Sequence, residues 1–424
     1  MISRLVSRCR PGDRESGQAS MVTVAMFMML FAAIAVSFTF VVISASRQAL
    51  NDSLQSSAKI AAESGVEDAK RLIVYCYNKR SGGSYTTSDA QQLCPQVVGK
   101  LSTQLEGMGC DEILEPMKGK GISDVEEESN GRGYRVKVGN NSGGKNENNE
   151  YYQCLKIATK TDNYQGVVNN LGKSVIVPLR VVDKYNQAAV IDRLEIEWHR
   201  NVTGNDGDDP AVMNGAQGTG LPKTTTWNSS NRPAVLRVER VGVPKGPFTL
   251  NSLADSDTAL TLRPSVNGNG GGKDKNRYHL GDYKPYYQSG RDSIAPNNQY
   301  GGKAPIVEVK CDGADYACKT IFEDSLDTTK TDYYLRINAI YRSTHFKITA
   351  YQGKDKLYFD GVQPLVDVTG RSSDSFSRIQ ARLKPSFDKN ADSTNWWPEY
   401  VIDTNGKVCK DIEVQYDTGE DRCK

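Results

Sequence analysis

The most regular feature of the chain is an apolar segment near its start that passes into a patterned helix. Residues 21–44 are 24 consecutive positions without a charged side chain. At about 1.5 Å per residue, such a helix spans a hydrocarbon core of roughly 30 Å. Apolar and small residues then recur at three- and four-residue steps, at Leu50, Leu54, Ala58, Ala61, Ala62, Gly65, Val66, Ala69, Leu72, Ile73 and Cys76. The pattern predicts one continuous helix over residues 18–76, made of a membrane-spanning segment and an amphipathic stem.

Beyond the stem the pattern changes twice. Ser88 to Gln91 matches a capping box, and a helical stripe continues to Leu105, so residues 77–129 are expected to form a small helical region. From residue 130 onward, short alternating segments predict strands at 194–198, 235–241, 259–262, 306–310, 334–341, 346–351 and 379–383. The fold class expected is α+β, with a long N-terminal membrane and stem helix followed by a β-rich globular head.

Long polar loops separate the predicted strands. The segments 139–150, 201–232 and 265–303 are rich in glycine and asparagine, and loops of this length are functional or disordered. The expected division is a basic leader at 1–17, the membrane and stem helix at 18–76, the helical region at 77–129 and the head at 130–424. The strand groups on either side of the last loop allow the head to be divided further, near 130–264 and 304–424.

The residues before the apolar segment predict its orientation. Four arginines precede it against two acidic residues, whereas only Arg47 follows closely, so the first 20 residues are expected in the cytoplasm and the remainder outside. Two kinds of processing are compatible with this start. A secretory signal would be cut near residues 44–46, but its apolar core is usually only about 7 to 15 residues long. The alternative is a cut after Gly17 that keeps the apolar helix, and the continuous pattern through residue 76 favours it.

Three features of the N-terminal quarter carry a family resemblance. The leader ends in Glu15-Ser16-Gly17, the apolar helix begins directly afterwards, and residues 61–69 read Ala-Ala-Glu-Ser-Gly-Val-Glu-Asp-Ala. Together these features resemble the N-terminus of PilX-type minor pilins of type IV pili, over residues 14–76. The resemblance implies that a prepilin peptidase cuts after Gly17, so that Gln18 becomes the first mature residue. It also implies that the apolar helix bundles with those of other pilins in the core of a filament.

One position departs from the pattern of major pilins. The fifth mature residue, usually Glu in such proteins, is Val22 here, which is similar to the large K-type tip pseudopilins. The function expected is therefore a minor type IV pilus subunit whose extracellular head serves pilus initiation and surface adhesion. Its expected partners are other pilins, the prepilin peptidase, the membrane and a surface or host-cell receptor. The alternative is an unprocessed single-pass membrane protein with an extracellular binding domain.

The near-zero net charge of the chain argues against nucleic-acid binding and does not oppose assembly. The chain has 53 basic and 51 acidic residues, and removal of the leader leaves 49 of each. A neutral chain lacks the basic excess that displaces counterions from phosphates, so no nucleic-acid partner is expected. Neutrality also means that net charge would not oppose packing into a filament.

The cysteines indicate an oxidising compartment. Of nine, Cys9 lies in the leader, and an even number of eight remains in the exported part. Eight cysteines allow 105 connectivities. The spacing favours local pairs: Cys76 with Cys94, Cys110 with Cys154, Cys311 with Cys318, and Cys409 with Cys423. No Cys-x-x-Cys spacing occurs, which argues against a zinc or thioredoxin-like site.

Calcium is the one candidate ligand. Asp388, Asn390, Asp392 and Glu399 occupy positions 1, 3, 5 and 12 of a calcium-loop pattern, although Ser393 replaces its turn glycine. Such Asx-rich runs are also common in plain turns. A less ordered group of side-chain oxygens comes from Asn205, Asp206, Asp208 and Asp209.

No motif predicts catalysis. The run from Gly166 to Ser174 has five residues between its glycines where a phosphate loop has four, and neither His-Glu-x-x-His nor Gly-x-Ser-x-Gly occurs. A tethered surface enzyme is accordingly the least favoured class, and no further cofactor is expected. The tyrosines at 278, 283, 286, 287 and 300 could form a contact surface or pack the loop onto its own sheet.

Overall fold

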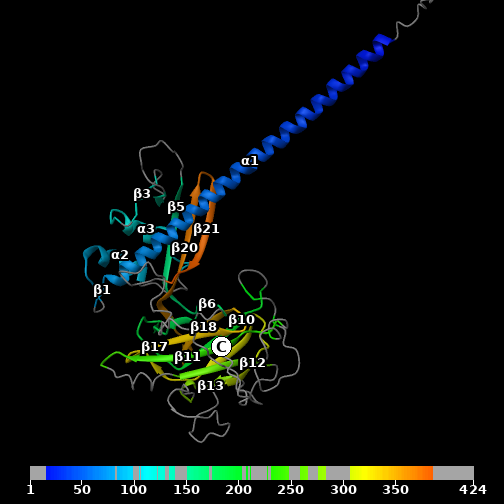
Figure 1. Ribbon diagram of the computed structural model, residues 1–424. Helices are drawn as coiled ribbons and strands as arrows, with labels where there is room; N and C mark the ends of the chain where they lie inside the picture. Colours follow the sequence, from blue (N-terminus) through cyan, green and yellow to red (C-terminus); the bar gives the residue numbers. More distant parts are fainter. Residues whose placement is uncertain are drawn as a thin grey trace, which may run out of the picture.

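The fold was analysed in a computed structural model of the full chain. It describes residues 16–81, 84–98, 105, 107–121, 123–128, 133–138, 150–170, 174–202, 207–208, 211, 227, 231–247, 258–265, 276–282 and 306–384. Within these residues the chain forms one very long helix and two separate hydrophobic cores, consistent with the α+β class. Figure 1 shows the helix projecting far beyond both.

Helix α1 (Ser16–Asn78) is 63 residues long, or about 95 Å. From residue 21 to 53 every side chain is exposed, and from Ala58 onward one face is buried. The helix is therefore continuous from the apolar segment into the stem, as the sequence pattern predicts.

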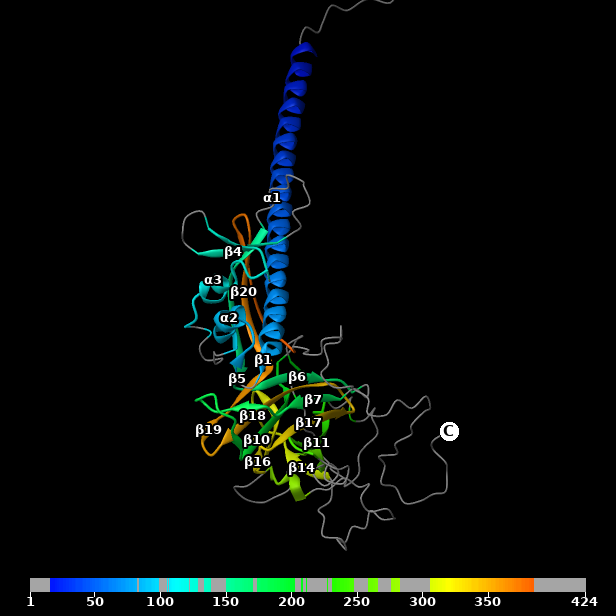
Figure 2. The same cartoon turned by 90° about the vertical axis from the view of Figure 1, so that its left-hand side faces the viewer.

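The C-terminal part of α1, from Ala58 onward, packs on an antiparallel sheet, and together they form the stem lobe. Its strands lie in the order β21 (Ser375–Arg382), β20 (Tyr358–Ser372), β5 (Glu150–Thr161), β4 (Tyr134–Lys137) and β3 (Val125–Glu127). The short helices α2 (Ser88–Val98) and α3 (Asp111–Met117) complete its core. In Figure 2 the sheet runs alongside α1.

The second core belongs to a two-sheet head. One sheet has the order β13, β15, β10, β18, β19, with β6 also paired to β18. The facing sheet has the order β14, β12, β11, β17, β7. The bounds are β6 Tyr164–Val168, β7 Val175–Pro178, β10 Arg193–Arg200, β11 Val235–Pro244, β12 Thr258–Ser265, β13 Arg277–Tyr278, β14 Ile306–Lys310, β15 Tyr316–Phe322, β17 Thr331–Ile340, β18 Thr344–Gln352 and β19 Asp355–Lys356.

Smaller elements connect these parts. They are β1 Arg80–Ser81 with β2 Ser84–Tyr85, β8 Val181–Val182 paired to β20, β9 Val190–Ile191 with β16 Leu326–Asp327, and the 3₁₀ turn η2 Leu280–Asp282. All seven segments predicted as strands fall on observed strands, β10, β11, β12, β14, β17, β18 and β21, with boundaries shifted by a few residues.

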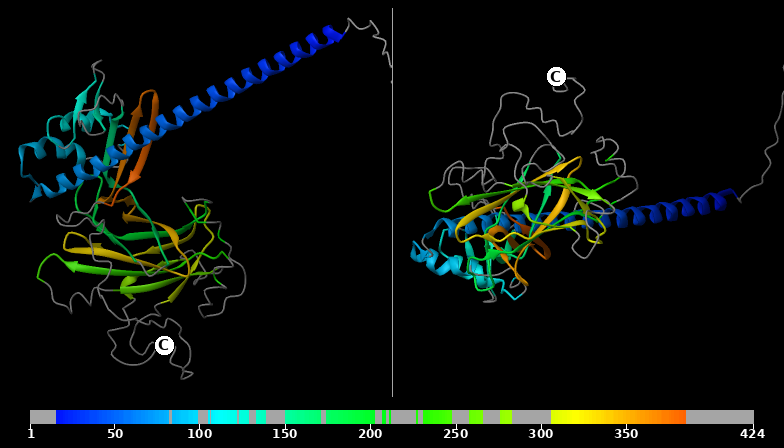
Figure 3. Two further views of the ribbon diagram at one scale, coloured as in Figure 1. Left: turned by 45° about the horizontal axis from the view of Figure 1, so that its top comes forward. Right: turned by 90° about the horizontal axis from the view of Figure 1, so that it is seen from below.

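The division into lobes differs from the one expected at residue 130. The head is a single insertion, since the chain leaves the stem lobe at the end of β5 and returns at the start of β20, which pairs with β5 antiparallel. Strands of residues 150–161 and 364–382 thus belong to the stem lobe and not to the head. Alternation alone cannot show this pairing, because the two strands are separated by about 200 residues. Figure 3 (left) shows both strands passing from one lobe to the other.

Candidate functional site: the N-terminal helix and its junctions

The projecting half of α1 has the character of a membrane span. It is the one helix among the described residues that is long and apolar enough to cross a membrane. The side chains of Phe27, Met29, Phe31 and Phe38 are each more than 60% exposed. Apolar groups that face no other part of the chain favour lipid or other apolar helices as neighbours.

Two hydroxyl groups in this segment are satisfied within the helix itself. Ser37 Oγ donates to Ala33 O at 2.9 Å, and Thr39 Oγ1 donates to Ala35 O at 2.8 Å. A hydroxyl bonded to its own backbone does not need water, so both residues are compatible with an apolar environment.

The residues expected at the processing site lie at the start of this helix. Gly17 and Gln18 are in the first turn of α1, and Val22 follows with 58% of its surface exposed. The apolar segment begins within four residues of the expected cut.

Small residues bring the docked half of α1 close to the sheet. Ala58, Ala61, Ala62, Gly65 and Ala69 are buried on its inner face. A Cβ placed on Gly370 of β20 would lie 2.1 Å from Ala58 O and 2.4 Å from Ala62 N. The helix backbone and the strand backbone are thus in direct contact, which requires glycine at this position.

The C-terminal end of α1 meets the entrance to the head, and we call this contact the joint. Tyr77 Oη donates a hydrogen bond to Asp360 Oδ1 at 3.0 Å, and the Arg180 guanidinium lies over the Tyr77 ring. Burial first, and then the Asp360 carboxylate, raise the pKa of Tyr77 well above its ordinary value, so the hydroxyl stays protonated and donates. Arg180 Nε donates to Asp360 O at 2.9 Å, and Asp360 N donates back to Arg180 O.

A buried lysine makes a second contact near the joint, between β5 and the end of α2. Lys160 of β5 is 1% exposed, and its Nζ donates to Val98 O at the end of α2 at 2.6 Å. An ammonium group at a helix C-terminus satisfies carbonyls that have no partner inside the helix. The end of α1 is therefore bonded to β20 and the end of α2 to β5, the two strands that connect the stem lobe to the head.

The described residues contain three disulfides, and each has the pairing expected from the spacing. They join Cys76 to Cys94, Cys110 to Cys154, and Cys311 to Cys318. The first links α1 to α2, and the second links the residue before α3 to β5. The third joins the end of one head sheet to the other. Cys409 and Cys423 lie outside the described residues.

The expected ligand groups are only partly placed. Asp388, Asn390, Asp392 and Glu399 lie outside the described residues, as do Asn205, Asp206 and Asp209. Asp208 is buried, and its Oδ2 accepts hydrogen bonds from Arg200 N, Thr344 Oγ1 and His345 N. This carboxylate is satisfied by protein donors, and no cluster of three or more His, Cys, Asp or Glu suited to a metal occurs in the part of the chain that is described.

Two other sequence features have structural explanations. Gly166 lies in strand β6, so the near-miss phosphate motif does not begin in a loop. Tyr278 of β13 donates from its Oη to Glu308 O of β14 at 2.8 Å, so this tyrosine is hydrogen-bonded to the facing sheet of the head. The other tyrosines of that run are outside the described residues.

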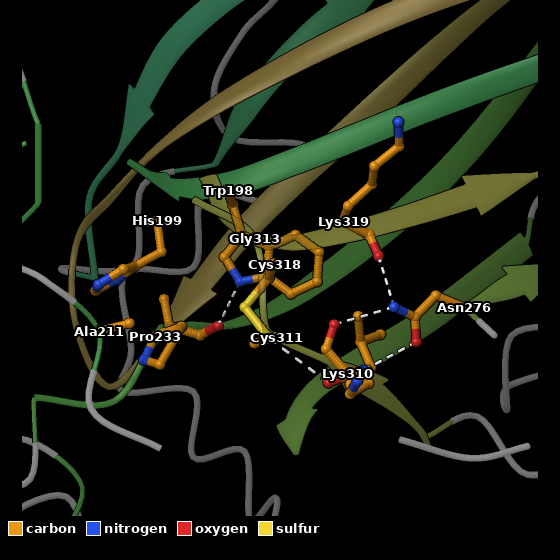
Figure 4. Close-up of a disulfide and its surroundings, with 12 residues drawn as sticks. Trp198, His199, Ala211, Pro233, Asn276, Lys310, Cys311, Gly313, Cys318 and Lys319 are labelled. Carbon is orange, nitrogen blue, oxygen red and sulfur yellow. Dashed lines mark hydrogen bonds between the residues drawn. A yellow bond between two sulfur atoms is a disulfide. The ribbon is translucent and has the colours of Figure 1, made fainter. Parts of the chain in front are cut away.

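Sequence reasoning missed a polar latch beside the head disulfide (Figure 4). Asn276 Nδ2 donates to Lys310 O and to Lys319 O, each at 3.0 Å, and Asn276 Oδ1 accepts from Lys310 N at 2.8 Å. Lys310 ends β14 and Lys319 lies in β15, so one side chain joins the two sheets. Its φ of 65° is in the left-handed region that asparagine tolerates. Nothing in the local pattern identifies such a residue, because its partners come from two other segments.

Comparison with protein-family models, with curated proteins and with solved structures finds no match for this chain.

Proposed function

We propose that the protein is a minor type IV pilus subunit. Before assembly it is anchored by α1, with its N-terminus in the cytoplasm and the stem lobe and head outside the membrane. After assembly the same helix packs among the helices of other pilins, and the head is presented at the cell surface for pilus initiation and adhesion. The proposal assigns no catalytic activity and no cofactor.

The continuity of α1 is the observation that carries the proposal. A simple anchor needs only to cross the membrane, and a flexible linker to the head would suffice. Here 33 exposed residues project from the stem lobe as part of the same helix that forms its core. A rigid projecting rod is suited to bundling side by side with similar rods, because its orientation relative to the lobe is fixed.

The proposed function can be tested at the expected cleavage site after Gly17. The mature N-terminus should be Gln18, and intact-mass measurement of the protein purified from membranes or sheared pili would detect it. A chain beginning at Met1 would support the alternative of an unprocessed single-pass membrane protein with a binding domain. A chain beginning near Arg47 would indicate a secretory signal. A Gly17→Leu variant should block the cut, whereas Ser20→Leu, three residues beyond it, should not.

A further inference from the structure

The path of the chain between α1 and the head forms a nearly closed loop. It leaves α1 beside the joint, forms α2, α3 and the strands β3, β4 and β5 of the stem lobe, and returns to the joint at the end of β5. Tyr77, next to Cys76, is bonded to Asp360, and Asp360 pairs with Lys160 in the β5–β20 ladder. Cys76 and Thr161, which are 85 residues apart in the sequence, therefore lie near each other.

Among the described residues, the segment from Cys76 to Thr161 is the only covalent connection between α1 and the head. Strand β20 also enters the stem lobe, but it continues toward the C-terminus and does not return to α1. If tension separates the head from α1, the hydrogen bonds of the joint and the packing of β20 on α1 carry it first. Once these contacts break, the backbone from Cys76 to Thr161 has to carry the tension.

We infer that the two stem disulfides act as a tether that limits how far the head can be pulled from the membrane helix. The two bridges join residues that are 18 and 44 positions apart. Together they prevent extension over 62 of the 85 positions between Cys76 and Thr161, so that 23 positions can extend. At about 3.5 Å per extended residue, the unbridged segment could lengthen to roughly 300 Å and the bridged one only to about 80 Å.

The positions of the bridges agree with this role. Cys76 lies two residues before the end of α1, and Cys154 lies seven residues before the end of β5. Each bridge thus begins or ends close to the point where tension enters the segment. The Cys311–Cys318 bridge is inside the head and shortens nothing on this path. The inference rests on the proposed function only for the source of the tension, a filament that holds α1 and a surface that holds the head.

Single-molecule stretching of the full chain tests the tether. The chain would be held in a nanodisc, with one handle at its N-terminus and the other on a peptide tag at Tyr185, a turn residue of the head that is 73% exposed. Any unfolding of the head between Thr161 and Tyr185 is common to all variants and cancels in the comparison. Removing the first bridge by Cys76→Ser with Cys94→Ser should lengthen the stem step by about 60 Å. Removing the second by Cys110→Ser with Cys154→Ser should lengthen it by about 150 Å.

The control is Cys311→Ser with Cys318→Ser, which should leave the stem step unchanged. Where a variant does not fold, wild-type molecules stretched before and after addition of a reductant give the same comparison, with an expected gain of about 220 Å. Equal steps before and after verified reduction would overturn the inference, as would a stem lobe that stays closed until the head has unfolded. An N-terminus at Met1 would remove the pilus proposal but would not alter these lengths.

Discussion

At the scale of single residues, Gly370 decides how closely α1 approaches the sheet. An added methyl group would meet the backbone of Ala58 and Ala62, and backbone atoms of a long helix cannot move aside as a flexible side chain can. We expect Gly370→Ala to lower the free energy of unfolding by about 1–3 kcal/mol. Denaturant titration would measure it. Gly246→Ala is the matched control, since nothing lies within 4 Å of its added Cβ, and it should change stability by less than about 0.5 kcal/mol. Equal effects of the two substitutions would contradict the close contact.

Asp367 is the residue for which a pH dependence is expected. Arg378 donates to both of its carboxylate oxygens and Gln380 to one, and Arg378 foremost holds the pKa of Asp367 below its ordinary value. A lowered pKa in the folded state means that the ionised carboxylate stabilises the fold above its ordinary pKa near about 4, and that this contribution is lost as pH falls further.

We expect Asp367→Asn to lower the free energy of unfolding by about 1–2 kcal/mol at pH 7. The effect should be no larger, because the partner Arg378 is largely exposed and solvent screens its charge. The difference from wild type should shrink as the pH falls below about 4. Unfolding curves between about pH 2.5 and pH 7 would follow this difference, because carboxylates titrate within that range. Asp355→Asn, whose side chain is 75% exposed, is the control. A difference that stays constant with pH would show that the pair does not stabilise through its charge.

At the scale of elements, the latch of Asn276 should matter as much as the disulfide beside it. Asn276→Ala removes three hydrogen bonds, two to Lys310 at the end of β14 and one to Lys319 in β15, and also leaves a residue without a polar side chain at a positive φ. We expect a loss of about 2–4 kcal/mol in thermal or denaturant unfolding. Asn276→Gly separates the two causes, because it keeps the backbone conformation and removes only the amide. If glycine restored wild-type stability, the hydrogen bonds would contribute nothing.

The continuity of α1 can be tested in the stretch between the apolar segment and the stem lobe. Gln48→Pro should kink or break the exposed helix at a cost of about 3 kcal/mol to that helix alone. Since the side chain of Gln48 is exposed, the stem lobe and head should keep their unfolding midpoint. Under the proposed function, the variant should fail to enter sheared pili, whereas Gln48→Ala should enter normally. Immunoblots of pilus and membrane fractions would compare them, and normal entry of the proline variant would count against a rigid rod.

Elements with a purely local signal could be predicted, and those defined by distant partners could not. The periodicity of the docked part of α1 and the alternation in β17 arise from one buried face each, which a single sequence displays. Strand β5 was missed because its last five residues, 157–161, are all buried and do not alternate. In β20, Gly361 and Pro364 interrupt the pattern where the strand passes from one lobe to the other. Of the candidate site, the apolar helix and the local disulfides could be inferred, but the joint joins segments about 280 residues apart.

At the scale of the whole molecule, the proposed function carries an expectation about where in a filament the subunit would lie. In type IV pilins the Glu at the fifth mature position is thought to pair with the terminal amine of a neighbouring subunit, and an unpaired charge among apolar helices is costly. Val22 cannot form that pair, which suits a subunit with no neighbour above it. The large head also favours the tip, where it meets no crowding.

Immunogold labelling of sheared filaments with an antibody to the head would locate the subunit. Under the tip hypothesis, gold should appear at one end of each filament. Regular decoration along the shaft would contradict it. A Val22→Glu variant should assemble less efficiently or change its position, and one that assembled more efficiently at the same position would count against the role given to Val22.

The insertion of the head between β5 and β20 has a consequence for how such a chain can diversify. Because Lys160 and Asp360 are ladder partners, the chain leaves the stem lobe for the head and returns to it at one point. A two-residue turn could close the same hairpin, and the stem lobe would keep its core, its two disulfides and its helix. Heads of other sizes could therefore be exchanged at this point without redesign of α1 and the stem lobe, the part that would assemble under the proposed function.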